Sequence, residues 1–203
     1  HEGRTRGNIG EGEAQIRWDL EFDYKDQQVM YGLPHQWMYN SGFPRNKVYT
    51  SCPSTRFRGL LSVGEDSWQI EGWPGMLGHN WGRAHNPRYH WAQCNLFENA
   101  DCIFEGWSAR LQLGPWLSPW LTGAAVRYAG EELLFNAVGG ILNRSVRTSL
   151  FAWSFEATQD DWRMQWQVEA DRADFAGLRY TNPDGVDNFC LNSKIASATL
   201  KLW

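Results

Sequence analysis

The residue types best suited to chemistry gather in one stretch of the chain, Gly72–Glu98, which reads GWPGMLGHNWGRAHNPRYHWAQCNLFE. It holds three histidines, His79, His85 and His90, separated by six and five residues. Zinc sites more often show shorter spacings together with thiolate or carboxylate ligands, so the sequence predicts neither a metal nor another cofactor. We expect the histidines either to act as hydrogen-bonding or acid/base groups in a pocket or to hold this loop in place.

A second candidate for chemistry is a glutamate in the following segment, Cys102–Leu113. If this segment is a strand, Glu105 and Trp107 share one face, and the rest of that face is apolar. A carboxyl group on an apolar face loses its solvation, which favours the neutral, proton-bearing form that a general acid needs. We therefore predict Glu105 as the catalytic acid, with His79 as the second candidate. The alternative is a position at the rim of the fold, where the carboxylate meets water.

One face of the segment Tyr89–Phe97 alternates aromatic and amide side chains. Such a mixture is unusual for a dry core and for a plain solvent face. It suits the wall of a ligand cavity, in which a few polar groups orient the ligand. The alternative is an exposed face with scattered aromatic residues. Together with the preceding loop GHNWGRAH and the strand of Glu105, this face supplies the predicted ligand-binding residues, Asn80, Trp81, His85, Tyr89, Trp91, Gln93, Asn95 and Trp107.

The elements that must position these residues are predicted to be strands. Ala14–Tyr24 alternates between apolar and polar side chains, which is typical of a half-buried antiparallel strand. Residues 1–12 are expected to form a loose arm, and residues 25–45 an irregular connection. Turns are expected at 64–66, 98–101, 129–130, 159–161 and 180–185. The other predicted strands are Lys47–Cys52, Phe57–Val63, Trp68–Trp73, Tyr89–Phe97, Cys102–Leu113, Leu121–Tyr128, Glu131–Phe135, Leu150–Ala157, Trp162–Glu169 and Lys194–Trp203.

This pattern indicates an all-β protein. No segment holds an apolar period of 3.6 residues beyond two turns, so no long helix is expected. Residues 136–149 are predicted to be a short helix or a loop. The whole chain reads as an antiparallel meander of about eleven strands. We expect it to close into a β-barrel, because closure would remove the exposed strand edges.

Composition narrows the classes of function. Nineteen basic and 23 acidic residues give a net charge of −4, which argues against a nucleic-acid or an anionic-membrane partner. The apolar runs are too short for a transmembrane helix. The 13 tryptophans suit an aromatic-lined cavity, a carbohydrate-stacking surface or a thick aromatic core. The four cysteines are too sparse for a disulfide scaffold, so we expect reduced thiols and a cytoplasmic protein, with a Cys94–Cys102 link as the alternative for a secreted one.

A resemblance to a known family is carried by the run GMLGHNWGRAH…YHWAQCNLF and the run FEGWSARLQLGPWLSPW that follows it. They resemble the lipocalin-like enzymes grouped with carotenoid hydratases (hydroxyneurosporene synthases) and tocopherol cyclases. The upstream FPRNKVYTSCPSTRFRG is similar to the linker region of the same group. The resemblance covers residues 43–120 well and the remainder in its strand rhythm, and its most specific elements are NWG and W-x-Q-x-N-x-F.

The resemblance implies a two-barrel protein. Residues 1–71 would be the end of a first lipocalin-like barrel with a linker, and residues 72–203 a second, truncated barrel. The opening strands of the first barrel would then come from a missing chain segment or from a homo-oligomer.

The resemblance also implies a chemistry, namely proton-initiated addition of water or of an internal phenol to an isoprenoid double bond. Glu105 or His79 would be the acid, and Trp81, Trp91 and Trp107 would stabilise the developing positive charge. Three functions stay open at this point. The first is a hydratase or cyclase acting on an isoprenoid- or polyketide-like substrate, the second is a non-catalytic carrier of an apolar ligand, and the third is a carbohydrate-binding module.

Overall fold

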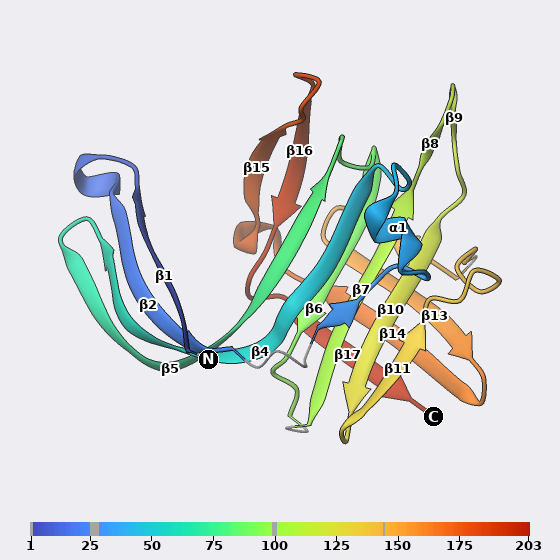
Figure 1. Cartoon of the computed structure of the whole chain (residues 1–203), viewed down its shortest axis with the longest axis horizontal. Coiled ribbons are helices and arrows are strands. Elements are labelled where there is room, and N and C mark those ends of the chain that lie inside the picture. Colours follow the sequence, from blue (N-terminus) through green and yellow to red (C-terminus); the bar gives the residue numbers. More distant parts are fainter. Residues whose placement is uncertain (1, 25–28, 99–100, 144) are drawn as a thin grey trace.

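The computed structural model describes residues 2–24, 29–98, 101–143 and 145–203, and it consists almost entirely of antiparallel strands (Figure 1). Within these ranges the one α-helix is a single turn, α1 (Trp37–Asn40), and 3-10 turns cover Gly12–Ala14 and Arg172–Asp174. The predicted all-β class is confirmed. No helix among the described residues is long and apolar enough to cross a membrane.

The first sheet is organised around one long strand. This strand, β4, pairs with β5 along one edge and with both β2 and β3 along the other, while β1 pairs with β2. The five strands are β1 (Glu2–Ile9), β2 (Ile16–Asp23), β3 (Met30–Tyr31), β4 (Asn46–Val63) and β5 (Asp66–Gly82).

Two further sheets follow in the chain. The middle sheet, in the order β11-β10-β7-β6, contains β6 (Arg88–Cys94), β7 (Cys102–Arg110), β10 (Leu121–Tyr128) and β11 (Glu131–Phe135). The back sheet contains β12 (Arg147–Thr148), β13 (Ala152–Gln159), β14 (Trp162–Glu169) and β17 (Ser197–Leu202), in that order. Two small hairpins are formed by β8 (Gln112–Leu113) with β9 (Trp116–Leu117) and by β15 (Ala176–Thr181) with β16 (Asp187–Asn192).

Most predicted strands are confirmed. The hairpins β6–β7, β10–β11 and β13–β14 all form antiparallel pairs. The turns of the last two hairpins contain Ala129 and Asp160, non-glycine residues with positive φ values of 50° and 53°. These elements were predictable because strand alternation and hairpin turns are local signals.

The predicted separation of Lys47–Cys52 from Phe57–Val63 is wrong, because both belong to the continuous strand β4. Between them the pairing register with β5 shifts near Cys52 and Thr55. Pro53 lies within this irregularity, where its missing N–H removes no regular ladder bond. Strand β5 likewise continues to Gly82, so the first part of the predicted loop GHNWGRAH is a strand.

The prediction of an unstructured segment at residues 1–12 is also wrong, because β1 pairs residue by residue with β2. Two glycines of β1 lie beneath aromatic rings of β2. A Cβ atom at Gly3 would lie 2.3 Å from the ring of Phe22, and one at Gly7 would lie 2.6 Å from the ring of Trp18. The rings therefore occupy the places where β1 side chains would stand, and this polar, glycine-rich strand has no alternating apolar pattern of its own.

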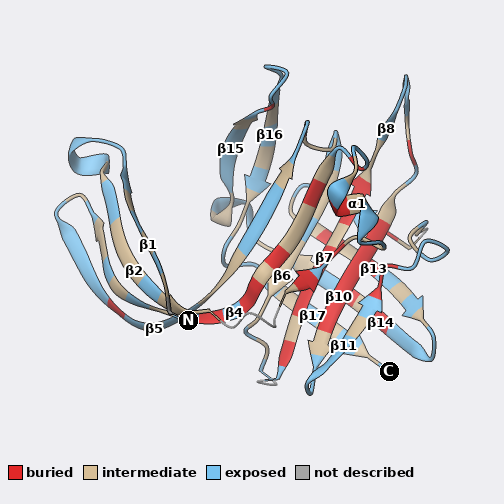
Figure 2. Ribbon diagram, viewed as in Figure 1, coloured by how far each residue is buried: buried red, intermediate tan, exposed pale blue. Residues whose placement is uncertain are grey.

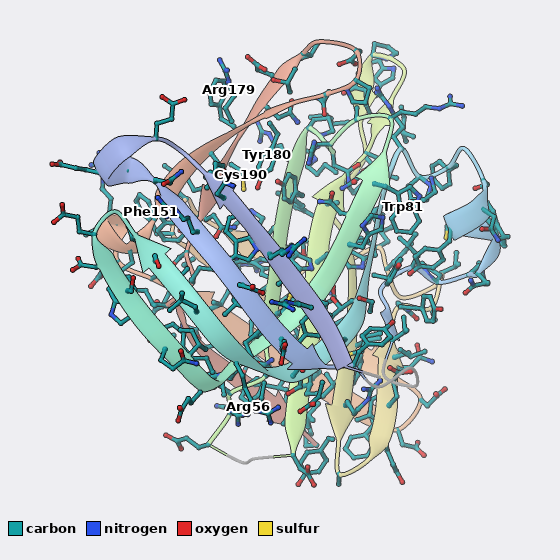
Figure 3. All side chains as sticks on the ribbon, turned by 60° about the vertical axis from the view of Figure 1, so that its left-hand side comes forward. Arg56, Trp81, Phe151, Arg179, Tyr180 and Cys190 are labelled. Atoms are coloured by element: carbon teal, nitrogen blue, oxygen red, sulfur yellow. The ribbon has the colours of Figure 1, made fainter. Side chains whose placement is uncertain are left out.

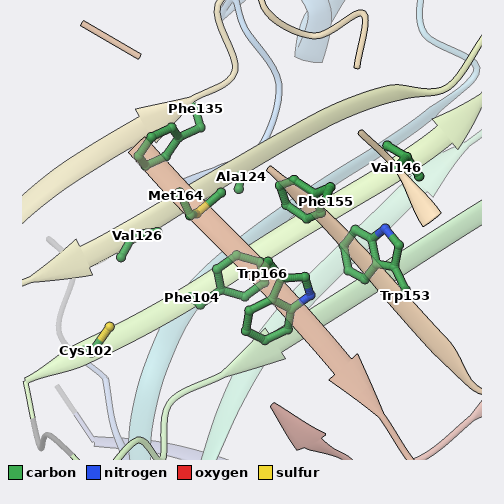
Figure 4. Packing of buried hydrophobic residues seen from close by; sticks show 10 residues of the cluster. All are labelled: Cys102, Phe104, Ala124, Val126, Phe135, Val146, Trp153, Phe155, Met164 and Trp166. Carbon is green, nitrogen blue, oxygen red and sulfur yellow. The ribbon is translucent and has the colours of Figure 1, made fainter. Parts of the chain in front are cut away.

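The hydrophobic core lies between the middle sheet and the back sheet (Figure 4). At its centre the ring of Phe104 in β7 stacks on the indole of Trp166 in β14. The ring centroids lie 3.7 Å apart and the ring planes are 12° from parallel. The buried apolar members of the cluster are Cys102, Phe104, Ala124, Val126, Phe135, Val146, Trp153, Phe155, Met164 and Trp166. Part of the tryptophan excess is thus core packing rather than a ligand wall.

The strand pairings do not close a barrel in the described part of the chain, since the sheets remain separate hydrogen-bonded ladders. The lipocalin-like barrel, the two-barrel arrangement and the division of the chain at residue 72 therefore stay predictions. Strands β1 and β2, with residues 57–63 of β4 and 66–73 of β5, form a unit that projects away from the other sheets, which we call the arm (Figure 1). Figure 2 shows that most buried residues lie outside the arm.

Candidate functional site

Strand β7 places Glu105 in the interior of the protein. Alternation directs Phe104 into the core and turns Glu105 and Trp107 to the opposite face of the middle sheet, which β3 and β4 cover. Glu105 is only 2% exposed. The expected burial of this glutamate is confirmed, and the alternative position at a solvated rim is wrong.

The carboxyl group of Glu105 is only partly satisfied by hydrogen bonds. The indole N–H of Trp91 donates to Oε1 at 3.0 Å. Among the described residues, Oε2 has no hydrogen-bond partner, and neither does the hydroxyl of Thr50, although that hydroxyl is close enough to act on the carboxyl group. Burial raises the pKa of Glu105 above its ordinary value, and the interactions with Thr50 and Trp91 oppose this rise without cancelling it. Glu105 therefore keeps its proton to a higher pH than an exposed glutamate does.

Aromatic side chains border this carboxyl group. The indole N–H of Trp107 donates to the backbone carbonyl of Gly32 at 2.9 Å, and the hydroxyl of Tyr39 accepts from the backbone N–H of Leu33 at 2.9 Å. Burial raises the pKa of Tyr39 to about 12, and the charge of Glu105 adds to the rise, which places the two groups within electrostatic reach. Tyr39 and Thr50 were missed from the sequence, because Tyr39 lies in an aperiodic connection and Thr50 in an ordinary strand pattern.

Two amides that were predicted to line a ligand cavity form hydrogen bonds to the backbone. The side chain of Gln93 donates to the carbonyl of Pro53 at 2.8 Å. The side chain of Asn95 donates to the same carbonyl at 3.0 Å and to the carbonyl of Gly75 at 2.9 Å. The irregular pairing at Pro53 leaves carbonyl groups that the strand ladder does not satisfy, so these amides complete the fold and tie β6 to β4 and β5.

We expect Asn95→Ala to lower the free energy of unfolding by about 1–3 kcal/mol, because the carbonyl of Gly75 loses its side-chain donor and the carbonyl of Pro53 keeps only Gln93. Gln69→Ala, at an exposed position of β5, is the matched control and should change the stability by less than about 0.5 kcal/mol. Urea unfolding followed by circular dichroism measures both values. Equal effects of the two substitutions would contradict the structural role of Asn95.

A small cleft collects other predicted residues. It has a volume of about 110 Å³ and lies between the ends of β4 and β5 and the turn from β15 to β16. The backbone N–H of His85 donates to Oδ1 of Asn182 at 2.9 Å, and Nδ1 of His85 lies 3.0 Å from the same oxygen. The lining residues are Asn46, Asn80, Trp81, Gly82, Ala84, His85, Thr181, Asn182 and Pro183. Because sites for whole drug-sized ligands measure about 300–1,000 Å³, this cleft fits a single ring-sized group.

The three histidines of the central stretch lie in three different surroundings. His85 faces the cleft, whereas His79 is exposed and stacks on Trp81 with ring centroids 5.2 Å apart. His90 stacks on Trp153 beside the core, and burial lowers its pKa. Over the described ranges, no group of three histidine, cysteine, aspartate or glutamate residues is placed to hold a metal ion.

Tyr89 joins the cleft region to the C-terminal hairpin. Its ring stacks on that of His85, which in turn contacts Tyr180 with a centroid distance of 5.0 Å. Burial raises the pKa of Tyr89, and the neighbouring thiol of Cys190 adds to the rise. Figure 3 shows Tyr180 and Cys190 close together on this hairpin and Trp81 on the side of α1. All four cysteines are free thiols.

The structure therefore divides the predicted residues into separate groups. Trp91 and Trp107 adjoin the buried carboxyl group of Glu105, although Trp91 itself is 37% exposed. Asn80, Trp81 and His85 lie together at the cleft. The group around Glu105 combines a buried carboxyl group of raised pKa with aromatic neighbours, so it is the better candidate for chemistry.

The fold and this group define an antiparallel β protein in which a carboxyl group of raised pKa is buried beside aromatic side chains. A model of the Tocopherol cyclase-like family matches residues 53–203, which is well over half of the chain, and the chain belongs to this family. No curated protein and no solved structure matches the chain. Trp91, Glu105 and Trp107 all lie within the matched segment, whereas Tyr39 and Thr50 precede it.

Proposed function

We propose that the protein binds a small molecule that carries an isoprenoid chain and cyclises it by proton transfer from Glu105. The observation that carries this proposal is the burial of Glu105 inside the segment that the family model matches. Its pKa is raised, and its Oε2 has no hydrogen-bond partner among the residues that the structure describes. A carboxylic acid that stays protonated in a water-poor interior can donate its proton to an alkene, which a solvated carboxylate does not do.

The proposed reaction is an isomerisation that conserves all atoms. The proton of Glu105 adds to one carbon of an isoprenoid double bond, and the π electrons form the new C–H bond. A phenol oxygen of the same substrate then donates an electron pair to the resulting carbocation and forms a C–O bond. The phenol proton leaves to the carboxylate of Glu105, which restores the acid for the next turnover.

The aromatic neighbours have a defined part in this scheme. The N–H groups of Trp91 and Trp107 are both engaged, with Glu105 and with the carbonyl of Gly32. These bonds fix the orientation of the two indoles, whose π faces can stabilise a carbocation as they stabilise other cations. The N–H···O bond from Trp91 also stabilises the carboxylate that forms when the proton leaves.

A second candidate is a carrier that binds the same class of ligand without turning it over. The hydrogen bond from Trp91 to Glu105 favours it, since a carboxyl group held in this way also suits a purely structural anchor. A third outcome is hydration, in which water instead of the phenol captures the carbocation and the product gains one water.

Geranylhydroquinone, which combines a phenol with an isoprenoid chain, is the probe that separates these candidates. We expect it to quench tryptophan fluorescence with a saturable, micromolar dissociation constant and to give a cyclised product of unchanged mass by liquid chromatography and mass spectrometry. A carrier would bind it and return it unchanged, and a hydratase would yield a heavier product. Failure to bind the probe, together with no apolar molecule retained in native mass spectra, would overturn the proposal.

A further inference from the structure

Thr50 of β4 lies against the carboxyl group of Glu105. Trp107, two residues after Glu105 on β7, donates to the backbone carbonyl that directly follows β3. Gln93, opposite Glu105 in the strand register, donates to the carbonyl of Pro53 in β4. Thr50 pairs with β3 and precedes Pro53 in β4. The two bonds therefore hold the face of Glu105 over the part of β4 that contains Thr50.

The hydroxyl of Thr50 is buried among apolar groups. Thr50 is fully buried, and its partners across the strand ladders are Met30 in β3 and Gly78 in β5. Met30 is also fully buried, and a Cβ atom added at Gly78 would lie 3.9 Å from Oγ1 of Thr50. Neither cross-strand partner offers this hydroxyl a polar side chain.

Two buried oxygens lack a partner at this place. In the described part of the chain, neither Oγ1 of Thr50 nor Oε2 of Glu105 has a hydrogen-bond partner. Buried polar groups are almost always hydrogen-bonded, and one that is left unsatisfied is costly. Thr50 nevertheless acts on the carboxyl group, since its hydroxyl opposes the rise that burial causes in the pKa of Glu105. A hydrogen bond between the two oxygens would satisfy both of them.

The second oxygen of the carboxyl group is already engaged. Oε1 of Glu105 accepts the indole N–H of Trp91 at 3.0 Å. In a neutral carboxyl group one oxygen carries the proton and donates, while the other oxygen remains an acceptor. The bond from Trp91 therefore assigns the acceptor role to Oε1 and leaves the proton on Oε2.

We propose that Thr50 is a positioning residue for the acid: its hydroxyl accepts from the Oε2–H group of neutral Glu105 and donates to Oε2 once the proton has left. A threonine hydroxyl can serve in both roles, because it has one donor and two acceptor sites and its hydrogen can rotate.

This exchange of roles fits the proposed reaction. The O–H bond at Oε2 breaks as the new C–H bond forms on the substrate, and the hydrogen of the Thr50 hydroxyl turns toward the oxygen that becomes negative. A hydrogen bond to a charged oxygen is stronger than one to a neutral oxygen, so Thr50 would favour the transition state over the ground state. This effect on turnover rests on the proposed function, whereas the contact between Thr50 and Glu105 does not.

The ionisation of Glu105 must be separated from that of its surroundings. Burial raises the pKa of Tyr39, which interacts electrostatically with Glu105, to about 12. Burial also raises the pKa of Tyr89, which belongs to β6 beside β7. Both phenols therefore stay neutral while a carboxyl group titrates. The strands that pack around the carboxyl group also carry Tyr31, Lys47, Tyr49, Cys52, Arg127 and Glu132.

Infrared difference spectroscopy of the whole chain over a range of pH measures this ionisation without any ligand. The carboxylic C=O band that disappears in Glu105→Gln belongs to Glu105. Thr50→Val keeps the shape of the side chain and removes the hydroxyl, so the carboxylate loses a donor. The midpoint of the titration should rise by about one pH unit, a tenfold change in the acid dissociation constant. Thr50→Ser keeps the hydroxyl and should return the midpoint to that of the wild type.

Thr55→Val is the matched control. Thr55 is buried on the same strand, but its hydroxyl donates to the carbonyl of Asp23 at 2.7 Å, so this variant should leave the midpoint unchanged. Thr50→Cys is a second test, because a thiol is a weaker donor, and its midpoint should lie between those of the serine and valine variants. Circular dichroism confirms that the variants are folded. A midpoint that Thr50→Val leaves unchanged or lowers would overturn the inference.

Turnover distinguishes this inference from the proposed function. If geranylhydroquinone is cyclised, Thr50→Val should lower kcat by about tenfold with little change in KM, and Thr50→Ser should restore it. If the probe is not cyclised but the midpoint still shifts, the contact between Thr50 and Glu105 stands and the proposed function fails. If the probe is cyclised and the midpoint does not shift, the role of Thr50 fails and the proposed function stands.

Discussion

Glu105→Gln is expected to lower the rate of cyclisation of geranylhydroquinone by about 10²- to 10⁴-fold, the usual contribution of a general acid. Glutamine is nearly isosteric and keeps an oxygen that accepts the indole N–H of Trp91. Its amide can also donate toward the hydroxyl of Thr50, which has no hydrogen-bond partner among the described residues. The substitution therefore removes the acidic proton and retains the packing.

The matched control is His79→Ala. His79 was the second acid candidate from the sequence, but its exposed imidazole stacks on Trp81 at the surface. We expect this variant to turn over at close to the wild-type rate. If the His79 variant lost activity and the Glu105 variant retained it, the assignment of the acid would be reversed. If both retained full activity, the proton would come from neither residue.

The pH dependence of stability gives the same variant a second readout, which does not require turnover. The pKa of Glu105 is higher in the folded protein than in the unfolded chain. Protonation of Glu105 therefore adds to the free energy of unfolding. This contribution is fully present below the ordinary pKa of a glutamate and is lost as the pH rises through the raised pKa of the folded state. Glutamine does not ionise and has no such loss. The stability of the wild type relative to Glu105→Gln should therefore fall with rising pH, by at most about 1.4 kcal/mol per pH unit. A flat difference would show that the pKa of Glu105 is not raised.

Trp166→Ala is expected to have the largest effect on stability, a loss of about 3–5 kcal/mol in the free energy of unfolding. Trp166 is fully buried and stacks on Phe104 in the centre of the core. Removal of its indole leaves a cavity between the middle and back sheets, which neighbouring strands can fill only in part. Urea unfolding followed by far-ultraviolet circular dichroism measures the loss.

Two variants on the same strand refine this result. Trp162→Ala removes an indole that is 36% exposed and should cost clearly less than Trp166→Ala. Trp166→Phe keeps an aromatic ring on Phe104 and removes an indole N–H that has no hydrogen-bond partner within the described residues, so it should also cost less than Trp166→Ala. Similar losses for Trp162→Ala and Trp166→Ala would contradict the placement of the core.

Sequence patterns predicted the candidate site in part. Glu105 was recognisable because its neighbours two residues away on the strand are Ile103 and Trp107, and period-two alternation carries that information locally. The same reasoning assigned Gln93 and Asn95 to a ligand wall, which stays a prediction, but it did not foresee their bonds to the backbone. Their acceptors are the carbonyls of Pro53 and Gly75, and no local pattern indicates which distant backbone group is left without a partner.

The errors in the fold have a similar cause. Strand β1 lacks apolar alternation, because aromatic rings from β2 cover its glycines. Strand β4 contains a proline, which in a sequence marks the end of a strand but here lies at an irregularity in the pairing. In both cases the strand forms because of its pairing with a neighbouring strand, and the local sequence gives no sign of that pairing.

The sequence by itself determined the all-β class, most of the hairpins and the apolar surroundings of Glu105, because each depends on side chains a few residues apart. Only the tertiary structure decided which predicted residues meet. It separated His79 from Glu105, set His85 against Asn182 at a sequence distance of 97 residues, and brought Thr50 and Tyr39 to the buried carboxyl group. The physical reason is that burial and hydrogen-bond partnership are properties of packed sheets, in which the partners come from distant parts of the chain.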